Sequence, residues 1–268
     1  MLGAIIGDIV GSRFEFDRPG WSKDFELFTS QNTFTDDTVM TVAVAQAILD
    51  TGEDVTESKV KRECIKNMQY FGALYPRAGY GASFIYWLAA DNPQPYNSFG
   101  NGSAMRVSAV GWAYDDLETT REVARWTAEI SHNHPEGIKG AEATAVAIYM
   151  LRNGWTKERM RAHIEAEYGY DLSKTVDELR PLHQHIENCM DSMPKAFAAL
   201  MEGTSYEDVI RNAVSLGGDT DTLAAIAGSM AEALYGVPEN IRKEAIQQYL
   251  PEDLWDIINK FEREYKGE

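Results

Sequence analysis

Two short clusters of threonine and aspartate stand far apart in the chain, and each is followed by residues that favour a helix. The first cluster is Thr35-Asp36-Asp37-Thr38, and the second is Gly217-Gly218-Asp219-Thr220-Asp221-Thr222. Threonine and aspartate at a helix start can cap the helix, because their side-chain oxygens accept hydrogen bonds from the first backbone N–H groups. Capping is a sufficient explanation of the first cluster taken alone.

The second cluster requires more than capping. The small residues that follow it, from Leu223 to Gly228, predict a closely packed helix and therefore a buried loop before it. Two carboxylates in a buried loop need a counter-charge, because burying an unpaired carboxylate costs on the order of several kcal/mol. An EF-hand calcium loop is excluded, because Ala224 and Met230 stand where that loop has glycine and glutamate. We therefore expect the two clusters to converge on a two-metal site for hard cations such as Mg²⁺ or Mn²⁺.

Helices must position these clusters. Apolar residues recur every three to four positions along most of the chain, whereas the alternation typical of strands is scarce. The pattern predicts helices near residues 37–51, 56–72, 80–90, 103–113, 123–130, 136–152, 157–168, 175–188, 205–215, 222–235 and 239–264. Gly3, Gly7 and Gly11 recur every four residues, which places them on one helix face that a neighbouring backbone can approach. No linker or repeat divides the sequence, so we expect one all-α domain over residues 1–268.

Charge and cysteine content limit the partners. The chain has 25 Lys and Arg against 42 Asp and Glu, a net charge of -17, which is the wrong sign for nucleic acid or an anionic membrane but suits divalent cations. Cys64 and Cys189 have no metal or disulfide spacing. The apolar stretch from Met1 to Val10 lacks a basic segment and is interrupted by Asp8, so it does not fit a signal peptide. We expect a cytoplasmic monomer.

Further motifs lie between the two clusters. In chain order, the full set is Gly3-x-x-x-Gly7-Asp8-x-x-Gly11-x-x-x-Glu15, Thr35-Asp36-Asp37-Thr38, Gly79-Tyr80-Gly81, Gly100-Asn101-Gly102-Ser103-Ala104-Met105-Arg106, Ser131-His132 and Gly217-Gly218-Asp219-Thr220-Asp221-Thr222. The set resembles the ADP-ribosylglycohydrolase family over nearly the whole chain. The family includes dinitrogenase reductase-activating glycohydrolases and the ADP-ribosylarginine and ADP-ribosylserine hydrolases. The resemblance implies a compact orthogonal bundle of helices with a binuclear Mg²⁺ or Mn²⁺ centre.

The resemblance also implies roles for individual acidic residues. The metal ligands would be Thr35, Asp36, Asp37, Asp219, Asp221 and Thr222. Glu15 resembles the active-site glutamate of the family and would act in catalysis together with Asp36 and Asp37, although a carboxylate at a helix end can also be a surface group. Glu15 and the four aspartates leave one negative charge beside two divalent cations, which suits the positive transition state of glycosidic cleavage.

Ligand-binding residues are predicted in three places. Gly100, Asn101, Gly102 and Ser103 could cradle a diphosphate with backbone N–H groups, or form only a tight turn. No Walker lysine follows, so a nucleotide triphosphatase is excluded. A metal pair of His132 and His134 lacks a third ligand nearby. The resemblance implies instead that His132 lines the ADP-ribose pocket. Tyr80 could stack on the ligand or pack in the core.

These residues predict a metal-dependent hydrolase that cleaves the N-glycosidic bond of an ADP-ribosylated protein and releases ADP-ribose. We expect an arginine linkage, while a serine linkage or a small-molecule adduct stays open. The alternative from another class is a catalytically silent ADP-ribose binder. An HD-type metal phosphohydrolase is excluded, because no histidine is followed by aspartate. An isoprenoid synthase is excluded as well, because Asp36-Asp37 is not part of an Asp-Asp-x-x-Asp motif.

Overall fold

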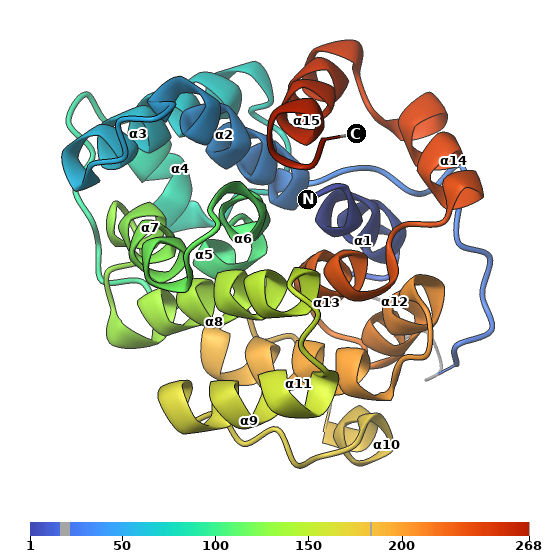
Figure 1. Cartoon of the computed structure of the whole chain (residues 1–268). Helices are drawn as coiled ribbons and strands as arrows, with labels where there is room; N and C mark the ends of the chain where they lie inside the picture. The colour runs from blue at the N-terminus through green and yellow to red at the C-terminus, as the bar shows by residue number, and fades with distance from the viewer. Residues whose placement is uncertain (17–21, 183, 268) are drawn as a thin grey trace.

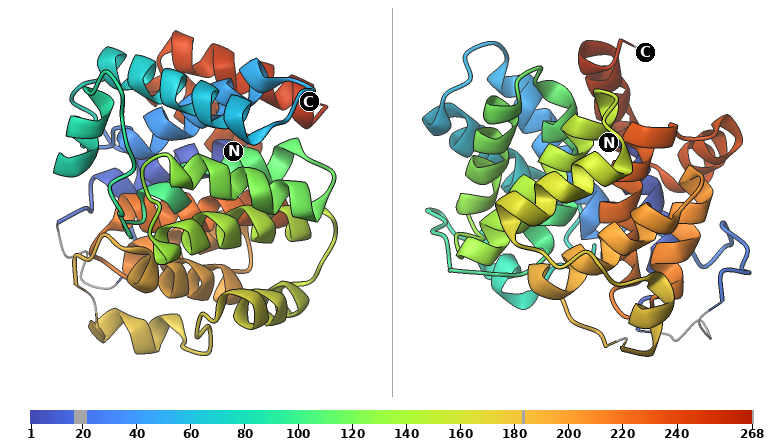
Figure 2. Two further views of the ribbon diagram at one scale, coloured as in Figure 1. Left: turned by 90° about the vertical axis from the view of Figure 1, so that its left-hand side faces the viewer. Right: turned by 60° about the horizontal axis from the view of Figure 1, so that its bottom comes forward.

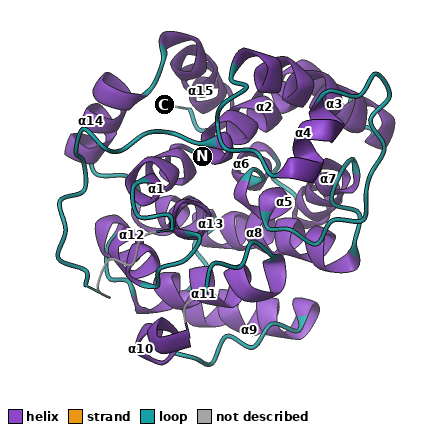
Figure 3. Ribbon diagram, turned by 180° about the vertical axis from the view of Figure 1, so that it is seen from behind, coloured by secondary structure: helices purple, strands orange, loops and turns teal. Residues whose placement is uncertain are grey.

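A computed structural model describes residues 1–16, 22–182 and 184–267 of the chain. Within these ranges the chain is built from helices and loops without a strand, and its one isolated bridge joins Gly100 and Asn188 (Figure 3). The predicted all-α fold is therefore confirmed. The helices are α1 (Leu2–Ser12), α2 (Asp36–Thr51), α3 (Glu57–Leu74), α4 (Ala82–Leu88), α5 (Gly102–Met105), α6 (Ser108–Ala113), α7 (Leu117–Glu129), α8 (Pro135–Arg152), α9 (Lys157–Tyr168), α10 (Val176–Leu179), η1 (Arg180–Leu182), α11 (Cys189–Glu202), α12 (Tyr206–Ser215), α13 (Thr220–Tyr235), α14 (Glu239–Tyr249) and α15 (Glu252–Tyr265).

Helices α1 and α13 pack against each other more extensively than any other pair (Figure 1). Gly3, Gly7 and Gly11 face α13, and a Cβ atom added at Gly7 would lie 2.1 Å from a carbonyl oxygen of α13. That distance is far below van der Waals contact, so glycine is required where the two backbones approach. The close packing brings the end of α1, with Glu15 just beyond it, beside the first turn of α13, which holds Asp221.

The remaining helices surround this pair. α2 packs against α3 and α15, while α8 packs against α7 and α9. α11 and α12 pack against α13 from the other side, as the two views in Figure 2 show. This arrangement leaves the N-terminal ends of α2 and α13 pointing toward the same region.

Three predicted helices differ from the observed ones. The run predicted for 103–113 is interrupted at Arg106 and Val107, where α5 ends before α6 begins. The run predicted for 239–264 is interrupted at Leu250, whose backbone is extended because Pro251 follows it. Of the run predicted for 175–188, only residues 176–182 are helical, and residue 183 lies outside the described residues.

Helix α11 was not predicted, because proline in a helix interior removes a backbone hydrogen bond and Pro194 lies inside it. Other interactions stabilise this helix. The side chain of Asn188 accepts a hydrogen bond from the N–H of Asp191 at 3.0 Å and caps the helix. Lys195 pairs with Asp191 one turn later, and the apolar face of the helix is buried.

Glu232 on α13 connects both ends of the described chain. Its carboxylate lies 2.6 Å from the Met1 ammonium and 3.0 Å from Nζ of Lys266. Cys64 and Cys189 are both buried and free, in agreement with their sequence spacing. No helix in the described part of the chain combines the length and hydropathy needed to cross a membrane.

Candidate active site and metal centre

A cavity of about 540 Å³ opens where the first turns of α2 and α13 meet the segments 79–84 and 96–102. Its wall includes most of the residues predicted from the sequence, namely Glu15, Asp36, Asp37, Tyr80, Gly100, Asn101, Gly102, His132, Asp219, Asp221 and Thr222. The predicted residues that lie outside the wall are Thr35 and Ser103, both of which are buried. The fold therefore brings both Thr/Asp clusters to one cavity.

Asp8 on α1 holds the first cluster in place. Its fully buried carboxylate accepts hydrogen bonds from the N–H groups of Thr35 (2.9 Å) and Thr38 (3.1 Å) and from their hydroxyls at 2.8 and 2.5 Å. Thr35 is also the N-cap of α2, and its Oγ1 accepts the N–H of Asp37 at 3.3 Å. The capping interpretation is thus confirmed for Thr35, which leaves the two aspartate side chains free for another task.

The two clusters meet at Asp37 and Thr222. Oγ1 of Thr222 donates a hydrogen bond to Oδ2 of Asp37 at 3.2 Å. The other carboxylate oxygen of Asp37, Oδ1, is buried and accepts no hydrogen bond from the described residues. A buried oxygen without a donor is unfavourable. A cation held between the clusters would give this oxygen the partner that it lacks.

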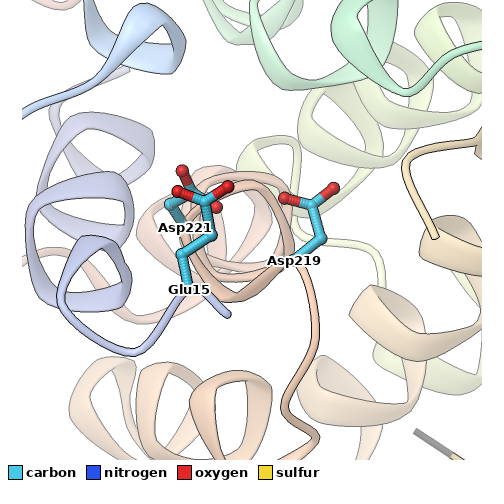
Figure 4. Close-up of side chains that lie close together, drawn as sticks. All are labelled: Glu15, Asp219 and Asp221. Atoms are coloured by element: carbon cyan, nitrogen blue, oxygen red, sulfur yellow. The ribbon is translucent and has the colours of Figure 1, made fainter. Parts of the chain in front are cut away.

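Glu15, Asp219 and Asp221 form an acidic group on the wall of the same cavity. Their carboxylates point toward one another in Figure 4, and one oxygen of each lies within 4.8 Å of the others. Asp219 is the N-cap residue of α13, but its side chain makes no capping bond. Its Oδ2 instead accepts a hydrogen bond from Nδ2 of Asn101 at 2.6 Å, and the same nitrogen donates to Ser192 on α11 at 2.9 Å. The amide nitrogen of Asn101 thus holds a predicted metal ligand.

Burial is the main cause that raises the pKa values of these carboxylates, and the charge of Asp221 adds to it for the others. Burial and the charge of Asp221 raise the pKa of Glu15 to about 7. The same two causes raise the pKa of Asp36, Asp37 and Asp219 well above the usual range of a carboxyl group. Arg106 supplies the one lysine or arginine side chain among the described residues of the wall. The donor set consists of hard oxygen atoms, so it fits Mg²⁺ or Mn²⁺ and lacks the nitrogen and sulfur ligands typical of zinc.

The segment before α4 fixes Asp36 from outside the cluster. The N–H of Asp36 donates to the carbonyl oxygen of Ala78 at 2.8 Å. Gly79 has a φ of 108°, and a Cβ there would lie 3.3 Å from Oδ1 of Asp36. Tyr80 is buried against Phe84 and also lines the cavity, where its hydroxyl has no hydrogen-bond partner among the described residues. The ring of Tyr80 therefore packs in the core and also forms part of the cavity wall.

Only some backbone N–H groups of the 100–103 loop already have a hydrogen-bond acceptor in the protein. The N–H of Gly100 donates to Oγ of Ser98, and the N–H of Asn101 donates to the carbonyl oxygen of Glu187. The N–H groups of Gly102 and Ser103 lie in the first turn of α5, where a helix offers them no acceptor. Of these two residues only Gly102 lies on the cavity wall, so an anion in the cavity would contact its N–H group and not the whole loop.

The side chain of Ser103 is directed away from the cavity. Its hydroxyl donates to the carbonyl oxygen of Gly137 at 2.7 Å. His132 lies on the cavity side of the same loop, because a Cβ added at Gly102 would be 3.0 Å from its Nε2. The structure thus brings His132, but not the Ser103 hydroxyl, to the predicted ligand-binding region.

Two residues at the site had no role assigned from the sequence. Asp8 is the only charged side chain in the apolar stretch Met1–Val10, and it is buried. A lone charged residue in an apolar segment is the sequence signal that could have indicated its role. Arg106 ends the Gly100–Arg106 motif and is fully buried beside the cavity. Motif spacing does not reveal these contacts, because both side chains form hydrogen bonds with residues that are distant in the sequence.

The sequence model of the ADP-ribosylglycohydrolase family matches residues 1–268. The chain belongs to this family. ADP-ribosylglycohydrolases are hydrolases that act on glycosyl bonds of ADP-ribosylated substrates, so the resemblance that the motifs predicted is confirmed.

Known ADP-ribosylglycohydrolases resemble this chain along most of its length. ADP-ribosylhydrolase ARH3 of Mus musculus is 26% identical over 90% of this chain and 84% of that protein. ADP-ribosylarginine hydrolase Tri1 of Pseudomonas putida is 26% identical over 96% of this chain and 76% of that protein. A solved structure described as an ADP-ribosylglycohydrolase-related protein complex has a TM-score of 0.76 at 21% identity, covering 98% of this chain and 95% of that one. This likeness establishes the fold.

Proposed function

We propose that this protein is a metal-dependent hydrolase that cleaves the N-glycosidic bond between ADP-ribose and an arginine side chain of a protein, and releases ADP-ribose. The observation that carries the proposal is the hydrogen bond from Thr222 to Asp37, which joins the two acidic clusters on the wall of one cavity. The cavity volume of about 540 Å³ suits a ligand of nucleotide size.

Six residues would hold two divalent cations, Mg²⁺ or Mn²⁺: Thr35, Asp36, Asp37, Asp219, Asp221 and Thr222. The hydroxyls of Thr35 and Thr222 donate their hydrogens to Asp8 and Asp37, so their oxygen lone pairs remain available for a cation. When bound, the cations supply Lewis acidity that orients ribose hydroxyls and lowers the pKa of a water molecule.

The acidic residues would stabilise charge and exchange protons at the reacting sugar. Cleavage of a glycosidic bond passes through a positively charged oxocarbenium-like transition state. The carboxylates of Asp36, Asp37 and Glu15 stabilise that charge, and Glu15 is half-buried at the cavity wall, where it can exchange a proton with the leaving group or the attacking water.

The 100–103 loop and His132 bind the rest of the ligand. The N–H group of Gly102 donates to the diphosphate, and Nε2 of His132 lies beside it. The largely buried ring of Tyr80 lines the same wall. Asn101 contributes indirectly, because its amide nitrogen donates a hydrogen bond to Asp219 and holds that carboxylate in place.

Two observations favour arginine as the linked residue. One relative is named ADP-ribosylarginine hydrolase Tri1. In addition, Glu187 lies on the cavity wall with 60% of its side chain exposed, and a guanidinium leaving group is a cation that such a carboxylate attracts. A serine linkage or a small-molecule adduct is the alternative within the same chemistry, and a silent ADP-ribose binder is the alternative outside it.

Turnover on defined substrates tests the proposal. Peptides carrying arginine-, serine- or glutamate-linked ADP-ribose are incubated with the chelated protein and then with added Mg²⁺ or Mn²⁺, and released ADP-ribose is measured. We expect metal-dependent release from the arginine-linked peptide. Glu15→Gln should lose turnover while it keeps most of its affinity for ADP-ribose. Tight binding without turnover on any peptide would indicate the silent binder, and no ADP-ribose binding at saturating metal would reject the assignment.

The state of the cysteines bears on the location of the protein. Two buried, unpaired cysteines are typical of a reducing compartment, which favours the cytoplasm. We propose a cytoplasmic monomer that has ADP-ribosylated protein and ADP-ribose as its partners. Size-exclusion chromatography and fractionation of cells that produce the protein test these two points.

A further inference from the structure

Arg106 is a fully buried arginine at the end of α5 and lines the cavity. Its Nη2 donates to the carbonyl oxygen of Thr127 at 2.9 Å and to Oγ of Ser131 at 2.8 Å. None of the hydrogen bonds that the described residues give it goes to a carboxylate. Burying a guanidinium without a bonded carboxylate is costly. The position of Arg106 therefore requires an explanation other than an ion pair.

Among the described residues, Nδ1 of His132 is the one acceptor within hydrogen-bond distance of the Ser131 hydroxyl. A guanidinium group only donates, so Oγ of Ser131 is the acceptor in its contact with Arg106. Oγ of Ser131 also lies 2.8 Å from Nδ1 of His132. Because the serine oxygen accepts from Arg106, its own hydrogen is free to be donated to Nδ1.

A histidine whose Nδ1 accepts a hydrogen bond carries its ring hydrogen on Nε2. This nitrogen faces the ligand loop, since Cβ atoms added at Gly102 and Gly100 would lie 3.0 and 3.4 Å from it. Rings of Phe84 and Tyr96 pack around the imidazole, with centroids at 6.3 and 5.8 Å. The Nε2–H group therefore lies where an oxygen of a bound ligand can accept its hydrogen.

The surroundings also oppose protonation of the ring. Burial, and then the positive charge of Arg106, lower the pKa of His132 well below its usual value. The aromatic rings of Phe84 and Tyr96 bring no negative charge that would reverse this effect. His132 is thus an uncharged donor in a cavity that otherwise contains many charges.

We propose that Arg106 is a positioning residue that acts through Ser131 to fix His132 as a neutral Nε2–H donor for an acceptor oxygen of the ligand. The identity of that ligand, ADP-ribose, rests on the proposed function. When the tautomer is fixed before the ligand binds, no binding free energy is spent on converting the other ring form. The Nε2–H group also stays a donor across the pH range in which ordinary histidines change charge.

Nitrogen NMR of the ligand-free protein tests the tautomer directly. Ring nitrogens are assigned with ¹⁵N-labelled histidine, with His163 on α9 as a reference outside the cavity. We expect an unprotonated Nδ1 and a protonated Nε2 for His132 from about pH 5 to 8, the range of ordinary histidine titration. A proton on Nδ1, or protonation of the ring within this range, would overturn the proposal.

Replacing Ser131 tests the connection to ligand binding. Ser131→Ala should give a mixture of His132 tautomers and weaken ADP-ribose binding roughly three- to tenfold, as expected for one hydrogen bond, while Mn²⁺ affinity is unchanged. Ser131→Thr keeps the hydroxyl and should restore the single tautomer. Ser229→Ala is the matched control, because it removes another buried serine hydroxyl, one that bonds to Ile226.

The two proposals fail in different ways. An unchanged His132 tautomer in Ser131→Ala would remove the role of Arg106 and Ser131, whatever the ligand is. A wild-type protein with the expected tautomer but without ADP-ribose affinity at saturating Mg²⁺ would instead overturn the proposed function, and with it the ligand assigned to His132.

Discussion

The hydroxyl of Thr222 donates a hydrogen bond to the carboxylate of Asp37, although 185 positions separate the two residues in the chain. Each residue belongs to the first turn of a different helix, α13 or α2. The N-terminal ends of both helices, with their acidic clusters, therefore meet at one cavity. The proposed metal centre draws ligands from both clusters, so it requires these two helices to keep their relative position.

Removing one carboxylate from this site should abolish activity without unfolding the protein. We expect Asp221→Ala, and likewise Asp36→Ala, to lower turnover by at least about 100-fold and to reduce Mn²⁺ binding, because these carboxylates are the proposed ligands of the cations. Circular dichroism should show unchanged helix content. Asp91→Ala, at an exposed aspartate, is the matched control. Full activity in Asp221→Ala would remove the metal from the mechanism.

The amide of Asn101 should matter for metal binding more than for ligand binding. Its Nδ2 holds Oδ2 of Asp219 at 2.6 Å, so Asn101→Ala should weaken Mn²⁺ affinity by about 10- to 100-fold. Calorimetry with Mn²⁺ alone measures this effect. Asn67→Ala, which removes a buried amide bonded to Asp50 away from the cavity, is expected to bind Mn²⁺ normally. Equal affinities in the two variants would show that Asp219 needs no support.

A methyl group at Gly7 should force α1 and α13 apart. Its Cβ would lie 2.1 Å from the carbonyl oxygen of Ala224 and cannot be accommodated by a side-chain rotation. We expect Gly7→Ala to lower the free energy of unfolding by at least about 2 kcal/mol. Gly81→Ala adds a methyl group where nothing lies within 4 Å and serves as the comparison in urea denaturation. A Gly7→Ala protein as stable as Gly81→Ala would contradict the close approach of the two backbones.

Glu232 should make stability depend on pH in acid. Burial raises its pKa, but the Met1 ammonium and Lys266 outweigh this effect and lower the pKa to about 2, compared with an ordinary value of 4.5. Because the folded protein has the lower pKa, the stabilisation is fully present above pH 4.5 and is lost as the pH falls through about 2.

Glu232→Gln should therefore lower the free energy of unfolding by roughly 3 kcal/mol at neutral pH. The difference from the wild type should shrink as the pH falls from 4.5 toward 2, the interval set by the two pKa values. Denaturant titrations at several pH values measure this difference. The exposed Glu264→Gln is the control. A difference that stays constant with pH would show that the ion pair is not its source.

Most elements of the fold could be predicted from the sequence, because local patterns encode them. The periodicity after Thr38 and the four-residue spacing of Gly3, Gly7 and Gly11 predicted α2 and the face of α1 that packs on α13. Predictions failed where tertiary contacts outweigh local preference. Helix α11 contains Pro194, and its stability comes from the cap at Asn188 and from the burial of its apolar face.

For the candidate site, local sequence patterns show which residue types are available and that two acidic clusters precede buried helices. How these residues are used depends on the packing of the helices. It directs the Ser103 hydroxyl to Gly137 and the Asn101 amide to Asp219, and it brings Asp8 under the first cluster. Hydrogen bonds have strict distance and angle requirements, and residues that are far apart in the chain meet these requirements only after the helices have packed.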